Sequence, residues 1–206
     1  MQVTPEGPTF TATARRAQIV AATIDTLAEL GYGQTTFARI AERAGLSSTR
    51  LISYHFAGKA ELMSTVVSEI YGTMGRFMGE RMAGRADARS LLRVYITALV
   101  EFIAGHQPQM QALMSIFLNH HDPDDGGRSY DAGDDRDAIG HVEAILRQGQ
   151  ADGEFRDFDT FVMAATIQRS LDGLPFLLQT RPGLDLDRYA RELVTTFDLA
   201  TRAPAR

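Results

Sequence analysis

The sequence predicts an all-α protein, and three of its properties point to that class. Apolar residues recur at spacings of three and four along most of the chain, which is the period of one face of an α-helix. No stretch alternates apolar and polar residues for long enough to predict a strand. Glycine and proline stand between the periodic segments, where helices end. We therefore expect about nine helices joined by turns.

The first three predicted helices follow each other closely. Residues 13–30 form the first, and a glycine-rich turn ends it. The second begins at Thr35 or Thr36, either of which can cap it with its hydroxyl, and Gly45 ends it. The third is capped by Ser47 or Ser48, extends to about His55 and can be anchored by Leu51, Ile52 and Phe56. Two short helices that are joined by a glycine-containing turn and backed by a longer helix predict a helix-turn-helix unit.

Six further helices are predicted beyond this unit. They cover residues 58–83, 91–104, 108–119, 136–151, 159–179 and 186–202. The connection at residues 120–135 is rich in aspartate and glycine, which predicts a mobile surface loop. We therefore expect a flexible segment at 1–12, a helix-turn-helix domain at 13–62 and a larger helical domain at 63–206, with the fourth helix linking the two domains.

Composition narrows the classes of protein. The chain has 206 residues, 44% of them hydrophobic, which is enough for a sizeable core. It has no cysteine, so a disulfide framework and a thiolate nucleophile are excluded, and a reducing compartment is favoured. Neither an apolar N-terminal signal nor a run of about 18 apolar residues is present. We therefore expect a cytoplasmic protein without a membrane segment.

The charge is distributed unevenly along the chain. The formal net charge is −5, which by itself argues against nucleic acid, because phosphate binding depends on lysine and arginine. Residues 1–62, however, contain six lysines and arginines against five acidic residues, so the remaining chain carries the negative charge. A near-neutral N-terminal domain on an acidic body is compatible with DNA binding.

The segment 16–63 contains "ELGYGQTT", "IAERAGLS" and "YHF" in that order, followed by Lys59 and Leu62 at the start of the fourth helix. It resembles the DNA-binding domain of the tetracycline-repressor-like (TetR) family of transcriptional regulators. The resemblance implies a homodimer with a C-terminal domain for ligand binding and dimerisation. It further implies a repressor without a cofactor, which a small apolar or aromatic effector releases from a palindromic operator on double-stranded DNA.

The third helix and its surroundings carry the predicted DNA contacts. The guanidinium of Arg50 can bond bidentately to a guanine edge. By the resemblance, Tyr54 lies at a base or groove wall and His55 faces a phosphate, although both can instead pack against the first helix. Lys59 and Thr36 are expected to bind phosphate at helix N-termini. The predicted DNA-binding residues are Thr36, Ser47, Ser48, Thr49, Arg50, Ser53, Tyr54, His55 and Lys59.

One feature departs from the family's common pattern. The sequence has one residue more between Gly45 and the terminal "HF". Either the turn is one residue longer or the recognition helix starts one residue later. The base contacts of Ser48, Thr49 and Arg50 can therefore shift by one position. Ser47 is expected to cap the helix and not to read a base.

The middle helices are rich in methionine and phenylalanine, which suits a pocket for an apolar molecule, although core packing accounts for most of these residues equally well. The candidate pocket residues are Phe102, His106, Met110, Met114, Phe117, Arg147 and Gln168.

A twofold dimer is expected because one short helix reads too few base pairs for genomic specificity. The last two predicted helices carry apolar stripes that can serve as an interface, and a monomeric core is the alternative. The candidate interface residues are Ala164, Ala165, Leu171, Leu178, Leu193 and Phe197.

An enzyme is the competing class. His120, His121, Asp122, Asp124 and Asp125 include ligand types for a divalent metal, but adjacent histidines point apart on a regular backbone. The sequence has no nucleophile elbow, phosphate-binding glycine loop or zinc-binding His-Glu-x-x-His pair. We therefore expect no catalytic or metal site. The alternative is a helical small-molecule-binding protein or enzyme with a helix-turn-helix-like domain.

Overall fold

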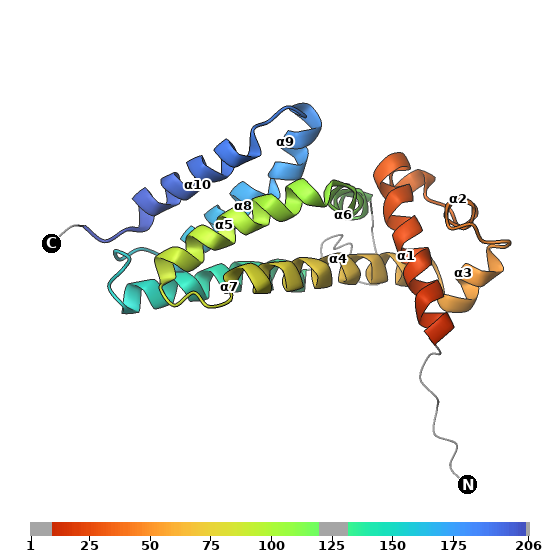
Figure 1. The fold of residues 1–206 in the computed structure, drawn as a ribbon, viewed down its shortest axis with the longest axis horizontal. Coiled ribbons are helices and arrows are strands. Elements are labelled where there is room, and N and C mark those ends of the chain that lie inside the picture. Colours follow the sequence, from red (N-terminus) through yellow and green to blue (C-terminus); the bar gives the residue numbers. More distant parts are fainter. Residues whose placement is uncertain (1–9, 120–131, 205–206) are drawn as a thin grey trace, which may run out of the picture. The chain divides into compact units, whose positions relative to one another are not determined.

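The computed structural model describes residues 10–119 and 132–204. Within these ranges the regular elements are all helical, and extended backbone pairs only at an isolated bridge between Phe155 and Arg202 (Figure 1). The predicted all-α class is confirmed. Among the helices of these two ranges, none combines the length and the apolar character that crossing a bilayer requires.

The described helices include each of the nine predicted ones. They are α1 (Phe10–Leu30), η1 (Tyr32–Gln34), α2 (Phe37–Arg43), α3 (Arg50–His55), α4 (Lys59–Met82), α5 (Ala88–Gly105), α6 (Gln107–Asn119), α7 (Ala132–Ala151), α8 (Thr160–Asp172), α9 (Leu174–Thr180) and α10 (Leu186–Thr201). The predicted helix at 159–179 is divided into α8 and α9 at Gly173. Pro175 explains the division, because proline fits the first turn of a helix and not its interior.

The chain forms two compact units. The first contains the described residues up to Gly72 together with 108–119, and the second contains residues 73–107 and 132–204. The division falls inside α4, the helix that is expected to link the two domains, and α6 groups with the first unit. Periodicity shows that a helix has an apolar face, but it does not show which neighbour covers that face.

The core of the first unit is formed by α1 to α4. Its fully buried side chains come from all four helices and include Ile19, Leu27, Ile40, Ile52 and Leu62. α1 ends at Gly31, where the backbone has a φ of 74°. A Cβ at this glycine would lie 3.8 Å from the hydroxyl of Ser115, so the end of α1 lies close to α6.

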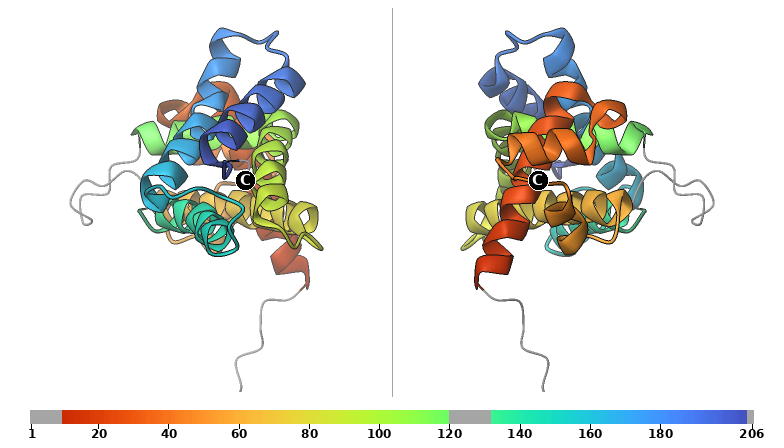
Figure 2. Two further views of the ribbon diagram at one scale, coloured as in Figure 1. Left: turned by 90° about the vertical axis from the view of Figure 1, so that its left-hand side faces the viewer. Right: turned by 90° about the vertical axis from the view of Figure 1, so that its right-hand side faces the viewer.

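The core of the second unit surrounds α5, which packs against α7, α8, α9 and α10. Figures 1 and 2 show α5 beside α7 and α10. Its buried side chains Leu92, Ile96 and Phe102 face this core. The carboxylate of Glu154 accepts hydrogen bonds from the backbone N–H groups of Ala88 and Arg89, 3.1 and 3.0 Å away, and so joins the turn after α7 to the start of α5.

Candidate nucleic-acid interface

The connection between α2 and α3 determines where the recognition helix begins. α2 is capped by Thr36, whose side chain accepts from the N–H of Arg39, and α2 is followed by Gly45 with a φ of 62°. The left-handed conformation at this position favours glycine. α3 begins at Arg50, one residue later than a cap at Ser48 predicts and two later than a cap at Ser47 predicts, so the additional residue of the sequence lies before the helix. Ser48, one of the two predicted caps, accepts from the N–H of Arg50 at 3.2 Å.

α3 has one buried and one exposed face. Of the three predicted anchors, Ile52 and Phe56 are fully buried and Leu51 is half-buried. Arg50, Ser53 and Tyr54 are exposed, and their spacing of three and four residues places them on one face. Tyr54 is 81% exposed, so its ring does not pack against α1. The structure therefore presents these three polar side chains together on the outer face of the recognition helix.

Arg16 of α1 joins the end of α3 to α4. Its guanidinium donates to the carbonyl of His55 and lies 4.1 Å from the ring centroid of Phe56. It also pairs with Glu61 at 3.1 Å and donates to the hydroxyl of Thr65 at 3.3 Å. A cation is favourable at a helix C-terminus, where carbonyl groups are unpaired. Sequence reasoning missed this role, because its partners are 39 or more residues away.

His55 itself is half-buried, and its ring meets the edge of the Tyr54 ring at a centroid distance of 5.1 Å. Glu61 caps the start of α4 by accepting from the N–H of Ala57 at 2.6 Å. This bond, together with the pairing to Arg16, lowers the pKa of the Glu61 carboxyl. One of the backbone donors at the predicted phosphate site of α4 is therefore occupied by a side chain of the protein.

Lys59, the first residue of α4, is directed at η1. Its ammonium donates to the carbonyl of Tyr32 at 3.0 Å and lies 4.0 Å from the centroid of the Tyr32 ring. Burial lowers the pKa of Lys59 because it disfavours the charged ammonium. The ammonium predicted to bind phosphate is thus engaged within the protein.

The other cations of the helix-turn-helix unit also have partners. Arg39 donates to the side chain of Gln34 at 2.8 Å and to its carbonyl at 3.2 Å. Arg43 pairs with Glu29, and hydrogen bonding to this arginine lowers the pKa of the glutamate. Arg15 donates to Gln18. Within the described residues 10–72, Arg50 is the basic residue whose side chain has no partner.

The predicted pocket residues are distributed over both units. In the second unit, the His106 ring stacks on Phe102 at a centroid distance of 4.0 Å, and its Nδ1 lies 2.9 Å from the Phe102 carbonyl. The ring of Phe77 approaches both rings edge-on, at 5.5 and 6.2 Å. Met110, Met114 and Phe117 lie on α6, where Met110 is buried and the other two are half-buried. The structure therefore brings Phe102 and His106 together.

The two remaining pocket candidates have intramolecular partners. Gln168 is buried, accepts from the hydroxyl of Tyr95 and donates to Asp172, both at 2.7 Å. Arg147 is exposed and pairs with Glu143 at 2.7 Å, one turn away on α7. Both ends of the Gln168 amide are thus used within the protein.

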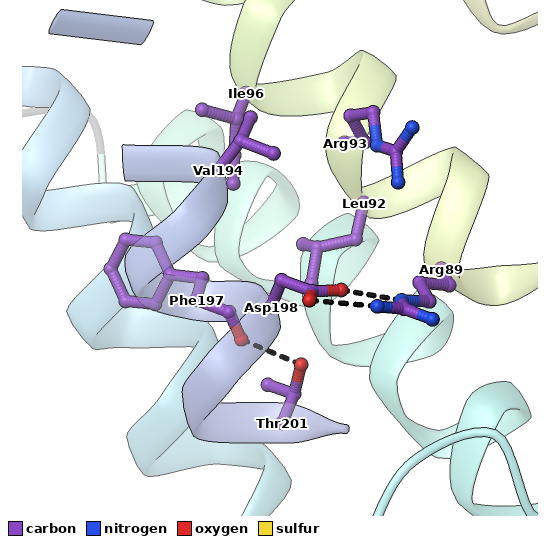
Figure 3. A pocket seen from close by; sticks show the side chains of 8 residues that line it. All are labelled: Arg89, Leu92, Arg93, Ile96, Val194, Phe197, Asp198 and Thr201. Carbon is purple, nitrogen blue, oxygen red and sulfur yellow. Dashed lines mark hydrogen bonds and ion pairs between the residues drawn. The ribbon is translucent and has the colours of Figure 1, made fainter. Parts of the chain in front are cut away.

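A shallow hollow of the second unit lies between α5 and α10 (Figure 3). Arg89 and Asp198 form a bidentate pair in it, which lowers the pKa of Asp198, and Arg93 lies on the same side of α5. None of the predicted pocket residues lines this hollow, and it has room for no more than about one water molecule. We therefore do not assign the effector to it.

The predicted dimer residues divide into two groups. Ala164, Leu171 and Phe197 are buried within the chain, whereas Ala165, Leu178 and Leu193 are half-exposed. The large apolar side chains exposed on α8, α9 and α10 are not among the predicted dimer residues. They are Phe161, Val162, Phe176, Leu177 and Leu199. The cluster at His120, His121, Asp122, Asp124 and Asp125 lies outside the described residues.

Comparison with known proteins connects this geometry to a family. Residues 19–66 match the family model described as bacterial regulatory proteins, tetR family. The HTH-type transcriptional regulator BetI 1 of Chromohalobacter salexigens is 34% identical over 87 residues, which are 42% of this chain and 41% of that protein. BetI of Paraburkholderia xenovorans is 35% identical over 104 residues, 50% of this chain and 53% of that protein. The chain thus spans about half the length of these curated relatives.

Solved structures share the fold over nearly the whole chain. The fatty acid degradation regulator FadR of Bacillus halodurans matches with a TM-score of 0.75 at 19% identity, covering 95% of this chain and 97% of that one. The ketosteroid transcriptional regulator KstR2 of Mycobacterium tuberculosis matches with a TM-score of 0.69 at 19% identity, covering 92% and 96%. At such identities the likeness concerns the fold, and the family match rests on the N-terminal segment. Residues 19–66 therefore form a helix-turn-helix domain of the TetR family of bacterial regulatory proteins.

Proposed function

We propose that the protein is a sequence-specific, DNA-binding transcriptional regulator that acts as a homodimeric repressor in the cytoplasm. The observation that carries the proposal is the exposed face of α3, where Arg50, Ser53 and Tyr54 lie together and the Arg50 guanidinium has no partner among residues 10–119 and 132–204. A guanidinium that is free of intramolecular pairs can donate two hydrogen bonds to the edge of a guanine. Ser53 and Tyr54 supply further hydroxyls for bases or phosphates.

The acidic body favours specific over indiscriminate binding. Of the six cations in residues 1–62, Arg16 and Arg43 are ion-paired with glutamates. Three others donate to neutral groups of the protein, which leaves fewer donors for sequence-independent phosphate contacts. A protein with this charge pattern gains affinity mainly where the recognition helix finds its bases. This supports a regulator and argues against an architectural DNA protein.

The proposal of a dimer rests on the small size of α3. α3 has six residues and offers three exposed polar side chains on one face, which is too few to select a genomic site. A twofold dimer doubles the contacts and reads a palindrome. We propose that the exposed Phe161 and Val162 of α8 and Leu199 of α10 contribute to the interface, with the half-exposed Ala165, Leu178 and Leu193.

The effector is proposed to be a small apolar or aromatic molecule. The aromatic cluster of Phe77, Phe102 and His106 in the second unit supports this chemistry. Two proteins of the same fold are described as fatty acid degradation and ketosteroid regulators, which agrees with an apolar ligand. An effector releases DNA only to the extent that it binds the released conformation better than the DNA-bound one.

Selection of bound duplexes from a random DNA pool tests the proposal. We expect enrichment of a palindrome, and we expect Arg50→Ala to weaken binding by about 1–3 kcal/mol and to relax one position in each half-site. Arg181→Ala, which removes an exposed arginine of the second unit, is the matched control and should leave the selected sequence unchanged. Failure to enrich any sequence would refute DNA recognition. An unchanged preference in the Arg50 variant would remove only Arg50 from the base-reading residues.

A further inference from the structure

Lys59 and Tyr32 are 27 residues apart in the sequence and meet at the edge of the helix-turn-helix unit. We propose that they form a clamp, and that Lys59 promotes DNA binding through this clamp and not by a phosphate contact of its own. The inference rests on the proposed DNA-binding function, and it assigns Lys59 as a positioning residue.

The contact between the two residues is twofold. The Lys59 ammonium donates to the Tyr32 carbonyl at 3.0 Å and lies 4.0 Å from the centroid of the same residue's ring. A cation at this distance from an aromatic centroid is attracted by the ring. The carbonyl takes one of the three N–H donors of the ammonium, and a phosphate contact that drew the ammonium away from η1 would break both contacts. The carbonyl also accepts from the N–H of Thr35, at 3.2 Å, and this bond does not involve Lys59.

The clamp acts on the segment that leads into α2. Tyr32 follows Gly31, whose φ of 74° turns the chain at the end of α1, and Tyr32 begins η1. The other end of η1 is fixed by Arg39 of α2, which donates to the side chain and the carbonyl of Gln34. η1 is therefore attached to α2 on one side and, through Lys59, to α4 on the other.

This attachment fixes the N-terminus of α2 relative to the N-terminus of α4. α2 begins after its cap Thr36, four residues beyond Tyr32, and α4 begins at Lys59 itself. The N–H groups of a helix N-terminus are suited to bind phosphate, and an operator presents its phosphates at fixed spacings. Holding the two N-termini in register therefore favours DNA binding without a contact from the lysine side chain.

The α3 side of the unit has a separate connection. Arg16 joins the C-terminus of α3 to Glu61 and Thr65 in the first turns of α4. Arg16 and Lys59 thus hold α4 against different parts of the unit, one against the recognition helix and one against η1. Removal of Lys59 should therefore change the geometry at η1 and α2 and leave the attachment of α3 in place.

The test is a double-mutant cycle with Lys59→Met, Tyr32→Leu and the double variant. Titrations with the selected operator are made over a range of salt concentrations. Each single variant should weaken binding by a factor of about 2–5, the range expected for one cation–π contact. The double variant should bind no more weakly than Lys59→Met alone, because Lys59→Met already removes the ring contact that Tyr32→Leu removes. The slope of log K against log salt should stay at the wild-type value in all of them.

Two conservative variants separate positioning from a general loss of structure. Lys59→Arg keeps a cation over the ring and should retain wild-type affinity. Tyr32→Phe keeps the ring and the backbone carbonyl, so Lys59→Met should weaken binding as much in the Tyr32→Phe background as in the wild type. All variants are compared at a temperature where circular dichroism shows them fully folded. Additive effects of the two single substitutions, or a salt slope reduced by about 0.9 in Lys59→Met, would overturn the clamp in favour of a phosphate contact.

The same cycle is measured by urea unfolding without DNA, which keeps the inference separate from the proposed function. Coupling between the two positions in unfolding, with no duplex selected by the wild-type protein, would refute the DNA-binding function and leave the contact in place. Independent effects in unfolding would overturn the clamp whatever DNA the protein binds.

Discussion

Gly149 near the end of α7 has no room for a side chain, so replacing it is predicted to destabilise the protein. A Cβ at this position would lie 2.2 and 2.4 Å from the ring carbons Cδ2 and Cε2 of Phe155 and 2.9 Å from the Cβ of Ala88. Its backbone is helical and does not require glycine, since Gly149 is not among the described residues with positive φ. The substitution Gly149→Ala therefore has two opposing effects on the free energy of unfolding. The added methyl group overpacks the core, whereas alanine is the better helix former.

The two effects have opposite signs and different sizes. Alanine is favoured over glycine in a helix by about 1 kcal/mol, and less near a helix end. Overpacking a dense core costs typically about 1–3 kcal/mol. Phe155 is 4% exposed and Ala88 is fully buried, so neither side chain can move outward freely. The contact of 2.2 Å places the cost at the upper end of that range, and we expect a net loss of about 2 kcal/mol in the free energy of unfolding.

The turn around Phe155 also limits relaxation by the backbone. The carbonyl of Gly149 accepts from the N–H groups of Glu154 and Phe155, at 2.8 and 3.0 Å. Glu154 in turn holds the start of α5 through its carboxylate. A shift of the Phe155 ring would therefore disturb the junction of α5 and α7.

Urea unfolding followed by circular dichroism measures the effect. Gly140→Ala is the matched control, because Gly140 lies within the same helix, is exposed and has nothing within 4 Å of a Cβ. The control should be stabilised by up to about 1 kcal/mol. A Gly149→Ala protein as stable as the wild type, with an unchanged dependence on urea, would show that the core relaxes and would refute this reasoning.

Two further predictions concern the second unit and the dimer. Burial, and to a lesser extent Asp172, raises the pKa of Tyr95. Above about pH 10 the unfolded state therefore loses the phenolic proton while the folded state keeps it. In that range the free energy of unfolding falls by about 1.4 kcal/mol per pH unit. Tyr95→Phe should lower the free energy of unfolding by about 1–3 kcal/mol at pH 7, because Gln168 loses its hydrogen-bond donor. This difference from the wild type should become smaller above pH 10. Unfolding curves that stay equally separated at all pH values would contradict the prediction. Val162→Arg should yield monomers in sedimentation and weaken operator binding, because Val162 is 58% exposed on α8. Leu118→Arg, at a side chain of similar exposure on α6, should remain dimeric, and a dimeric Val162→Arg protein would exclude this part of α8 from the interface.

The helices and the helix-turn-helix unit were predictable because their signals are local. The spacing of apolar residues identified the buried Ile52 and Phe56 of α3, and the glycine of the turn, Gly45, has the expected positive φ. Thr36 caps α2 as one of two predicted candidates. The division at Gly173 was missed, although Pro175 signals a helix start two residues later.

The dimer candidates show where periodicity stops being informative. An apolar stripe predicts that a helix face is covered, but both the chain's own core and a second copy can cover it. The structure buries Ala164, Leu171 and Phe197 in the protomer and exposes Phe161 and Val162 instead. The choice between these residues depends on how α8 and α10 are rotated against their neighbours in the second unit.

The sequence by itself determined the helical class, the turn that separates α2 from α3 and the family of the N-terminal domain, because each is encoded over short spans of chain. Only the tertiary structure decided which cations are available. Arg16 and Lys59 find their partners 39 and 27 residues away, so their charges are engaged by contacts that no local pattern contains. Arg50 has no such partner among the described residues, and its guanidinium lies on the outer face of α3, where we propose that it contacts DNA.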